Sequence, residues 1–179
     1  MTAFVSLFRA INVGGNHQVK MSALKAMHEA LGLRGVVPYI QSGNVVFHSD
    51  EADALLRAQI EQRFETTFGF QSAVLLRAAA EFDAIVASGP FQGQPDKAPQ
   101  YVVVLFLAAR PDAAAQEDLL ASYAGPEEIH IIGQEAHIYY AEGQGRSKLT
   151  GSYLERKLKT LGTARNWNTV LQLQQLLHS

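Results

Sequence analysis

The stretch VVPYIQSGNVVFH, residues 36–48, decides the fold, because it has the pattern of two β-strands joined by a tight turn. Its two apolar, β-branched halves flank Ser42-Gly43, a dipeptide typical of hairpin turns. Pro38 has no backbone N–H to donate to a neighbouring strand, so the first of the two strands is expected at a sheet edge. The stretch therefore predicts an antiparallel pair whose Pro38-containing strand is outermost.

A strand and a helix are predicted upstream of this hairpin. Residues 2–8, TAFVSLF, have an apolar strand pattern. Apolar residues then recur at helical spacing from Met21 to Leu31, and Gly32 is a typical C-terminal cap. A polar segment with two adjacent glycines, residues 9–20 (RAINVGGNHQVK), separates the two predicted elements.

A helix and a strand are also predicted downstream. Asp50 is the expected N-cap of the helix, whose apolar face runs from Leu56 to Phe68. Residues 71–77, QSAVLLR, follow as a strand. The order from residue 2 to residue 77 is thus β-α-β-β-α-β, the order of a ferredoxin-like unit.

The same order recurs in the second half of the chain. A short helix is expected near residues 80–88, and GPFQGQPDKAP, residues 89–99, holds three of the six prolines and predicts a linker. The pattern beyond it predicts, in order, strand 101–107, helix 112–123 with Asp112 as its cap, strands 127–132 and 136–141, helix 147–161, strand 163–165 and a last helix from Trp167.

Strand 101–107, YVVVLFL, is apolar at every position, so both of its faces are expected to be covered. Packing of the two halves sheet against sheet is the simplest way to cover them. We predict an α+β fold made of two ferredoxin-like units in tandem, each with an antiparallel sheet. The predicted divisions are residues 1–88 for the first unit with its short helix, 89–100 for the linker, and 101–179 for the second unit with its C-terminal helix.

Composition excludes several classes of protein. Among 179 residues, 47% are hydrophobic and 18% charged, enough apolar material for a core. The chain has no cysteine, which excludes disulfides and thiolate metal sites and is typical of a reducing cytoplasm. The longest apolar run, residues 101–109, is too short to span a bilayer, and no secretory signal pattern is present. We expect a cytoplasmic protein with no membrane partner.

Charge is distributed unevenly along the chain. Residues 1–28 contain three cations and no acid, and residues 143–179 contain six cations and one acid, whereas the whole chain has a net charge of −2. Two basic ends and an acidic centre form a pattern that can steer an anionic ligand, although ordinary solvated surfaces also produce it.

Polar residues of the first half are expected to meet at one end of its sheet. In a β-α-β-β-α-β unit, the loop after the first strand and the hairpin after the second emerge at the same end, beside a helix N-terminus that favours an anion. Ordinary turn chemistry is the alternative reading of the glycines and asparagines. The predicted ligand-binding residues here are Arg9, Asn12, Gly14, Gly15, Lys20, Gln41, Ser42 and Asn44.

The second half repeats this arrangement with GRSK, residues 145–148, and TARNWNT, residues 163–169, each ahead of a helix. Ser147 and Asn166 are also expected N-caps, and Trp167 is either a stacking platform or a core residue. The predicted ligand-binding residues are Ser147, Lys148, Arg165, Asn166 and Trp167. We predict one anion-binding cleft formed by both sets.

Several reactive motifs are absent from the sequence. It contains no P-loop, no G-x-G-x-x-G fingerprint and no G-x-S-x-G elbow. The six histidines lack metal-ligand spacing, so no metal and no cofactor are predicted. His17 has no acid nearby to act with it, so no catalytic residue is assigned and the question of enzymatic activity stays open.

Four ordered motifs carry a family resemblance: LFRAINVGGNHQVKMSALK, YIQSGNVVF, GRSKLT and TARNWNTVLQL. Together they resemble the bacterial domain of unknown function 1697 family over essentially the full length. The resemblance implies two ferredoxin-like subdomains in a cytosolic bacterial protein and no established activity. Family members often carry a glycine where Ala10 stands and a basic residue near Asn16.

The leading functional hypothesis is an anion-binding cleft for a phosphorylated or carboxylated small molecule. Single-stranded nucleic-acid binding is an alternative, because ferredoxin-like topology and basic ends occur in RNA-binding modules. The strand NVVFH lacks their glycine-aromatic signature, so nucleic acid is the less favoured partner. A non-catalytic structural or assembly module is the third hypothesis. No oligomeric state is predicted.

Overall fold

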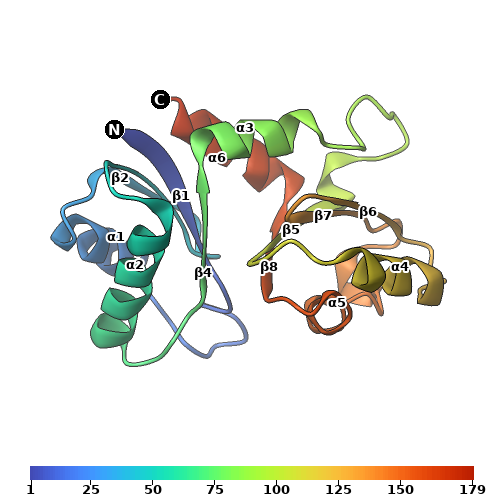
Figure 1. Ribbon diagram of the computed structural model, residues 1–179, viewed down its shortest axis with the longest axis horizontal. Helices are drawn as coiled ribbons and strands as arrows, with labels where there is room; N and C mark the ends of the chain where they lie inside the picture. Colours follow the sequence, from blue (N-terminus) through green and yellow to red (C-terminus); the bar gives the residue numbers. More distant parts are fainter. The chain divides into compact units, whose positions relative to one another are not determined.

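The computed structural model describes residues 1–179 as an α+β fold with two four-stranded antiparallel sheets (Figure 1). Both the predicted α+β class and the two antiparallel sheets are confirmed. The chain divides into two compact units: unit 1 is Met1–Asp83 with Gln172–Ser179, and unit 2 is Ala84–Leu171. Residues 89–100, predicted as a linker, thus group with unit 2, and the last eight residues group with unit 1.

Unit 1 contains the hairpin that the sequence indicates. Its strand order is β2-β3-β1-β4, so β2, which holds Pro38, is an edge strand as predicted. Its elements are β1 (Thr2–Phe8), α1 (Met21–Ala30), β2 (Arg34–Tyr39), β3 (Asn44–Ser49), α2 (Asp53–Phe68), β4 (Val74–Ala78) and the start of α3 (Ala79–Ala87).

The core of unit 1 lies between its sheet and its first two helices. In Figure 1, α1 and α2 cover one face of this sheet. Phe4 and Phe8 of β1 belong to the same buried cluster as Leu24 of α1 and Phe64 of α2. Since side chains alternate along a strand, Val5 faces the opposite side of the sheet, and it too is buried.

The two predicted caps in unit 1 have different outcomes. Gly32 ends α1 as predicted, with a φ of 81° and its N–H bound to the carbonyl of Glu29 at 2.9 Å. Asp50 is wrong as the N-cap of α2, because the helix begins at Asp53 after Ala52. The Ser49 hydroxyl accepts the N–H of Glu51 at 3.1 Å, and this turn delays the start of the helix.

Unit 2 repeats the element order of unit 1. Its strand order is β6-β7-β5-β8, and all six residues of β5 are buried, as predicted for a strand covered on both faces. Its elements are η1 (Pro99–Tyr101), β5 (Val102–Leu107), α4 (Ala113–Ser122), β6 (Glu128–Ile132), β7 (Glu135–Tyr139), η2 (Gln144–Arg146), α5 (Gly151–Leu158), β8 (Gly162–Asn166) and the start of α6 (Trp167–Leu177).

Helices α4 and α5 cover one face of the unit 2 sheet (Figure 1). Leu105 of β5 and Ile138 of β7 cluster there with Leu119 of α4 and Leu154 of α5. Because side chains alternate along β7, His137 faces away from this cluster. The opposite face of β7 therefore presents a histidine.

Of two predicted helix caps in unit 2, one is confirmed and one is wrong. Asp112 caps α4 as predicted, because its Oδ1 accepts the N–H of Ala115 at 2.7 Å. Ser147 is wrong as the cap of α5. The Ser147 hydroxyl instead donates to Glu127 Oε1 at 2.5 Å, and α5 starts later, capped by Thr150.

None of the helices is both long and apolar enough to cross a lipid bilayer.

Candidate functional site

The polar loop and the hairpin of unit 1 meet as predicted. Asn12 Nδ2 donates to the carbonyl of Gln41 at 2.8 Å, and the N–H of Phe8 donates to the carbonyl of Gly43 at 2.9 Å. Asn12 also holds its own loop closed, because Oδ1 accepts the N–H of Val19 at 2.6 Å and Nδ2 donates to the Val19 carbonyl at 3.0 Å. The Asn12 amide therefore serves as a brace between two loops.

Asn44 and Ser42 brace the hairpin in the same way. Asn44 is fully buried, and its Nδ2 donates to the carbonyl of Tyr39 at 2.9 Å and to Ser42 Oγ at 3.0 Å. These contacts stabilise the turn that the sequence predicts. They also occupy the amide nitrogen of Asn44, which the sequence predicts as a ligand-binding residue.

The remaining predicted residues of unit 1 lie nearer the surface. Gly14 and Gly15 have φ angles of 61° and 77°, and the bridge between Val13 and Asn16 closes their exposed turn. Lys20 is exposed immediately before α1, whereas Arg9 is half-buried. The structure brings the loop and hairpin backbones together, and Lys20 is the exposed cation there.

The predicted residues of unit 2 lie at one end of its sheet. The ends of β7 and β8 both adjoin the start of β5, because the N–H of Tyr140 donates to the Tyr101 carbonyl at 2.8 Å and Asn166 Nδ2 donates to the Gln100 carbonyl at 3.0 Å. Asn166 also acts as the predicted cap of α6, since its Oδ1 accepts the N–H of Asn168 at 2.9 Å.

Arg165 and Lys148 have opposite environments. Arg165 lies within β8 and is only 6% exposed, and its guanidinium donates to Thr163 Oγ1 at 2.7 Å and to the Ala164 carbonyl at 2.9 Å. Burial lowers its pKa to about 10. Lys148 is exposed. Arg165 is therefore a buried, hydrogen-bonded cation rather than a surface one.

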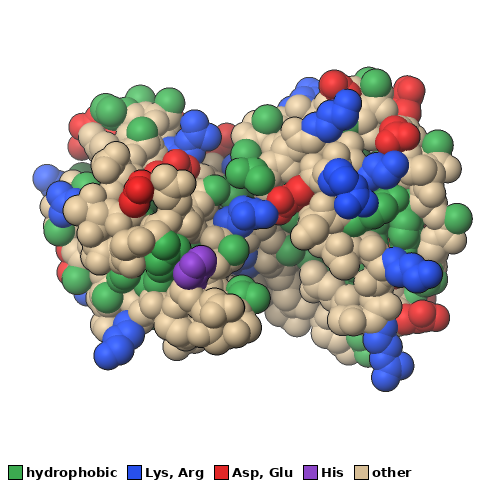
Figure 2. Space-filling view, turned by 90° about the horizontal axis from the view of Figure 1, so that it is seen from below, with side chains coloured by type: hydrophobic (Ala, Val, Ile, Leu, Met, Phe, Trp, Pro, Cys, Tyr) green, Lys and Arg blue, Asp and Glu red, His purple; other side chains and the backbone are tan.

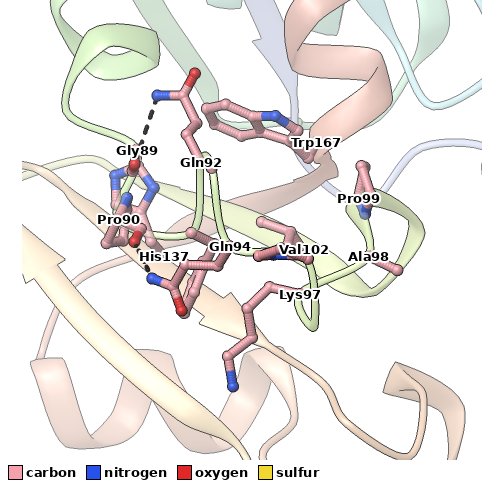
Figure 3. A pocket seen from close by; sticks show the side chains of 13 residues that line it. Gly89, Pro90, Gln92, Gln94, Lys97, Ala98, Pro99, Val102, His137 and Trp167 are labelled. Carbon is pink, nitrogen blue, oxygen red and sulfur yellow. Dashed lines mark hydrogen bonds between the residues drawn. The ribbon is translucent and has the colours of Figure 1, made fainter.

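Trp167, the last predicted residue, lines a cavity of about 510 Å³ in unit 2 (Figure 3). The other walls are residues 89–95 and 97–99, Val102 of β5 and His137 of β7. We call this space the unit 2 cavity. Its largest wall is the proline-rich segment that the sequence predicts as a linker.

Side-chain hydrogen bonds fix this segment in place. Gln92 Nε2 donates to the carbonyl of Val86 at 2.6 Å, and Gln94 Nε2 donates to the carbonyl of Pro90 at 2.7 Å. The Tyr139 hydroxyl donates to the carbonyl of Asp96 at 3.1 Å. The wall is therefore pre-formed by contacts within unit 2.

His137 is the unusual residue of the cavity. It is 1% exposed, and neither ring nitrogen has a hydrogen-bond partner in the protein. Burial lowers its pKa to about 4, so the ring is neutral near pH 7. His28 in unit 1 is buried to the same degree, but its nitrogens contact Ser6 Oγ at 3.0 Å and the Leu24 carbonyl at 2.8 Å.

The unit 2 cavity is nearly free of charge. No Asp or Glu lines it, and Lys97 is its one charged residue. Lys97 Nζ lies 4.5 Å from the centre of the Tyr139 ring and 3.6 and 3.8 Å from the carboxylates of Asp96 and Glu128. In Figure 3 the ammonium points away from Trp167. The cavity therefore presents an aromatic, largely uncharged interior.

Residues 1–137, which span all the strands of unit 1 and, in unit 2, β5, β6 and the first part of β7, match the model described as "Protein of unknown function (DUF1697)". The chain belongs to this family. The predicted family is thereby confirmed.

The DUF1697 chain is also similar to a protein of known structure. The conserved bacterial protein SP0830 from Streptococcus pneumoniae is 26% identical, with a TM-score of 0.78 and 98% of each chain covered. Since nearly the whole length is covered, the similarity includes the elements that form the unit 2 cavity. The search of curated proteins found no match.

Sequence reasoning missed His137 and the wall formed by residues 89–99. The signal for His137 is its place in EAHIY, where the alternating positions Ala136 and Ile138 are apolar and buried. A histidine on the second face of a strand that is buried on both sides needs a hydrogen-bond partner for its ring nitrogens. The DUF1697 chain holds no cluster of three or more side chains suited to bind a metal ion.

Proposed function

We propose that this DUF1697 protein binds a small organic molecule with a flat ring in the unit 2 cavity. The observation that carries the proposal is the cavity itself, an open space of about 510 Å³ lined by Trp167 and by a segment that hydrogen bonds within unit 2 hold in place.

The shape and lining of the cavity support a ring-shaped ligand. Its volume falls within the ordinary range of small-molecule sites, which are mostly apolar with a few placed polar groups. Trp167 lines the cavity, so the part of its indole that is open there can contact a flat ring. The hydrogen bonds of Gln92 and Gln94 hold the wall in place before binding, which lowers the entropy cost of association.

We propose that both units are ferredoxin-like. Each has the element order β-α-β-β-α-β and a strand order in which the first and third strands are central. In unit 2 this topology places β7 next to β5, so His137 lies opposite Val104. The central strands of the unit thus supply two walls of the cavity, Val102 and His137.

A second candidate function is anion binding at residues 9–20 of unit 1. This is one part of the anion-binding hypothesis drawn from the sequence, and the exposed Lys20 supports it. Lys20 is exposed immediately before α1, whose first turn holds no acid. Positive charge beside a helix N-terminus favours an anion. Phosphate should then raise the melting temperature of the wild type more than that of Lys20→Ala. Equal shifts would reject this site. The single anion-binding cleft and the cytoplasmic location stay predictions.

Nucleic-acid binding finds less support. RNA-recognition modules stack bases on an open sheet face, whereas the central strands β1 and β5 are buried on both faces. On the surface seen in Figure 2, several Lys and Arg side chains lie beside Asp or Glu side chains. A phosphate-binding stripe would instead hold cations without acids between them.

Trp167 provides a direct test, because it is the one tryptophan in the chain and it lines the cavity. The probes are benzimidazole and indene, two fused-ring molecules of nearly equal size. Binding of either should change the Trp167 emission in a saturable way and raise the melting temperature, since a ligand that binds only the folded state stabilises it. N-acetyltryptophanamide controls for quenching in solution. If neither probe produces both effects, the proposal is wrong.

A further inference from the structure

Two of the four edge strands of the protein are open. β2 and β4 end the sheet of unit 1, and β6 and β8 end the sheet of unit 2. Most residues of β4 and β8 are buried, whereas most residues of β2 and β6 are exposed or half-buried. An open edge presents a row of backbone N–H and C=O groups, which is a template for pairing with another strand.

The edge strand β2 has features that block such pairing, and β6 has none of them. In β2, Pro38 lacks an N–H, and the register with β3 shifts between Arg34 and Val37. β6 has the sequence EIHII, with no proline and no lysine, and its register with β7 is unbroken over all five residues. Of the two open edges, β6 is therefore the regular template.

The pairing of β7 shows which backbone groups of β6 face outward. The N–H of Tyr140 donates to the Tyr101 carbonyl at 2.8 Å, so the even-numbered residues of β7 bond to β5. The odd-numbered residues of β7 bond to β6, whose even-numbered residues lie opposite them. The other two residues of β6, Ile129 and Ile131, point their N–H and C=O groups away from the sheet, where these groups have no partner in the protein.

The side chains of β6 indicate a second copy of β6 as the partner strand. Glu128 and His130 lie on the same face of the sheet, 3.0 Å apart, and each side chain is 44% exposed. If two copies pair antiparallel with Ile129 opposite Ile129, Glu128 of each copy lies opposite His130 of the other. These two pairs then occupy non-hydrogen-bonded positions, where side chains across a sheet are closest. The charge pattern of β6 is thus complementary to itself.

We propose that the protein forms a two-fold symmetric dimer in which the β6 strands of two copies pair antiparallel around Ile129. The unit 2 sheets of both copies then form one continuous sheet. This inference does not depend on the proposed function. Because a strand of five residues covers less than the ~800 Å² per partner of a standard complex, the association should be weak and concentration-dependent.

Charge reversal tests the pairing by sedimentation velocity of the full chain, from about 10 μM to about 1 mM. The wild type should pass from monomer to dimer over this range. Glu128→Lys and His130→Glu should each weaken association at least about tenfold, because each removes both symmetric pairs. A double variant with both changes should restore it, since opposite charges face each other again. Arg34→Glu, on the edge strand β2, is the matched control and should dimerise like the wild type.

Three outcomes of this experiment would overturn the inference. The first is a wild type that stays monomeric at every concentration. The second is dimerisation that Glu128→Lys leaves unchanged, because the contact would then lie elsewhere. The third is a double variant that melts at the wild-type temperature but is as monomeric as the single variants.

A second measurement needs no variant. Exchange of the Ile129 and Ile131 N–H groups with solvent should slow as the concentration of wild-type protein rises, because pairing protects them. The N–H of His130 already faces β7 in the monomer and is the internal reference, so its exchange should change less. Exchange of Ile129 and Ile131 that is independent of concentration would overturn the inference and would leave β6 open to a strand of a different protein.

Discussion

The backbone of Gly89 and the indole of Trp167 are so close that a β-carbon on Gly89 would lie 2.7 Å from Cη2 of the ring. Real β-carbons do not approach other atoms so closely, so a side chain at Gly89 must displace the indole. Trp167 is 7% exposed, held against the segment that forms the cavity wall. The absence of a side chain at Gly89 therefore sets the shape of the cavity.

We expect Gly89→Ala to weaken the binding of benzimidazole at least about tenfold, because the displaced indole enters or distorts the cavity. The fold should survive, since the added methyl group meets the outer edge of one ring. Trp167 emission in the free protein should change as well. Gly145→Ala is the matched control, because a β-carbon there meets no atom within 4 Å. Equal binding by both variants would show that Gly89 does not shape the site.

His137 and His28 should respond in opposite ways to replacement by phenylalanine. His137→Phe removes two unpaired buried nitrogens and should leave the free energy of unfolding unchanged or raise it by about 1 kcal/mol. His28→Phe removes contacts to Ser6 and Leu24 and should lower it by about 2 kcal/mol. Urea unfolding of both variants measures the difference. A large loss in His137→Phe would mean that His137 has a structural role.

Much of the fold could be predicted from the sequence, because hydrophobic periodicity reports burial directly. Strand 102–107 is apolar throughout and is buried throughout, and Pro38 marks an edge. Helix starts were harder to predict, as Asp50 and Ser147 show. Both are good caps by residue type, but hydrogen bonds formed by Ser49 and by Glu127 settle the local turns. These hydrogen-bond partners are set by the folded structure, so residue type alone does not predict them.

The candidate site was harder still. The sequence indicates that residues 9–20 and the hairpin meet. It does not show that the side-chain amides of Asn12 and Asn44 are already hydrogen-bonded to backbone carbonyls there. It places Arg165 in a strand without showing that its guanidinium is buried. The cavity depends on residues 89–99, whose prolines suggest a linker and whose glutamine hydrogen bonds appear only in the folded chain.

Asn12→Ala tests the bracing role found for Asn12. The variant loses three hydrogen bonds that join the loop to Val19 and to Gln41, and should lower the free energy of unfolding by about 2 kcal/mol. Asn16→Ala, in the same loop, is the control, because Asn16 is exposed and its hydrogen bonds use only its own backbone atoms. It should change stability by less than about 0.5 kcal/mol. Similar losses in both variants would contradict the bracing role.

Ala10→Gly should stabilise the protein. Ala10 has a φ of 59°, in the left-handed region, where a β-carbon costs roughly 1 kcal/mol. Glycine removes this strain but gains entropy in the unfolded chain, so we expect a net gain of about 0.5 kcal/mol. The matched control is Ala58→Gly in the exposed face of α2, which should lose about 1 kcal/mol. Thermal unfolding of both variants measures the two changes in stability, which should have opposite signs. A loss of stability in Ala10→Gly would contradict backbone strain at Ala10.

The two buried histidines should make the protein less stable as the pH falls. Burial lowers the pKa of both His28 and His137 from 6.5 to about 4. Between these two values the unfolded chain binds more protons than the folded one, so the free energy of unfolding decreases with falling pH across this window and levels off above pH 6.5. Each histidine contributes a slope of up to about 1.4 kcal/mol per pH unit.

His137→Phe separates the two contributions. The variant keeps His28, so the decrease in stability between pH 6.5 and about 4 should be roughly half that of the wild type. Glu127 has a lowered carboxyl pKa, and its own loss of stability falls at the acidic end of the range, so the upper part of the window isolates the histidines. Urea unfolding midpoints at a series of pH values measure the slope. An identical slope in wild type and variant would show that His137 is not neutral and buried in the folded protein.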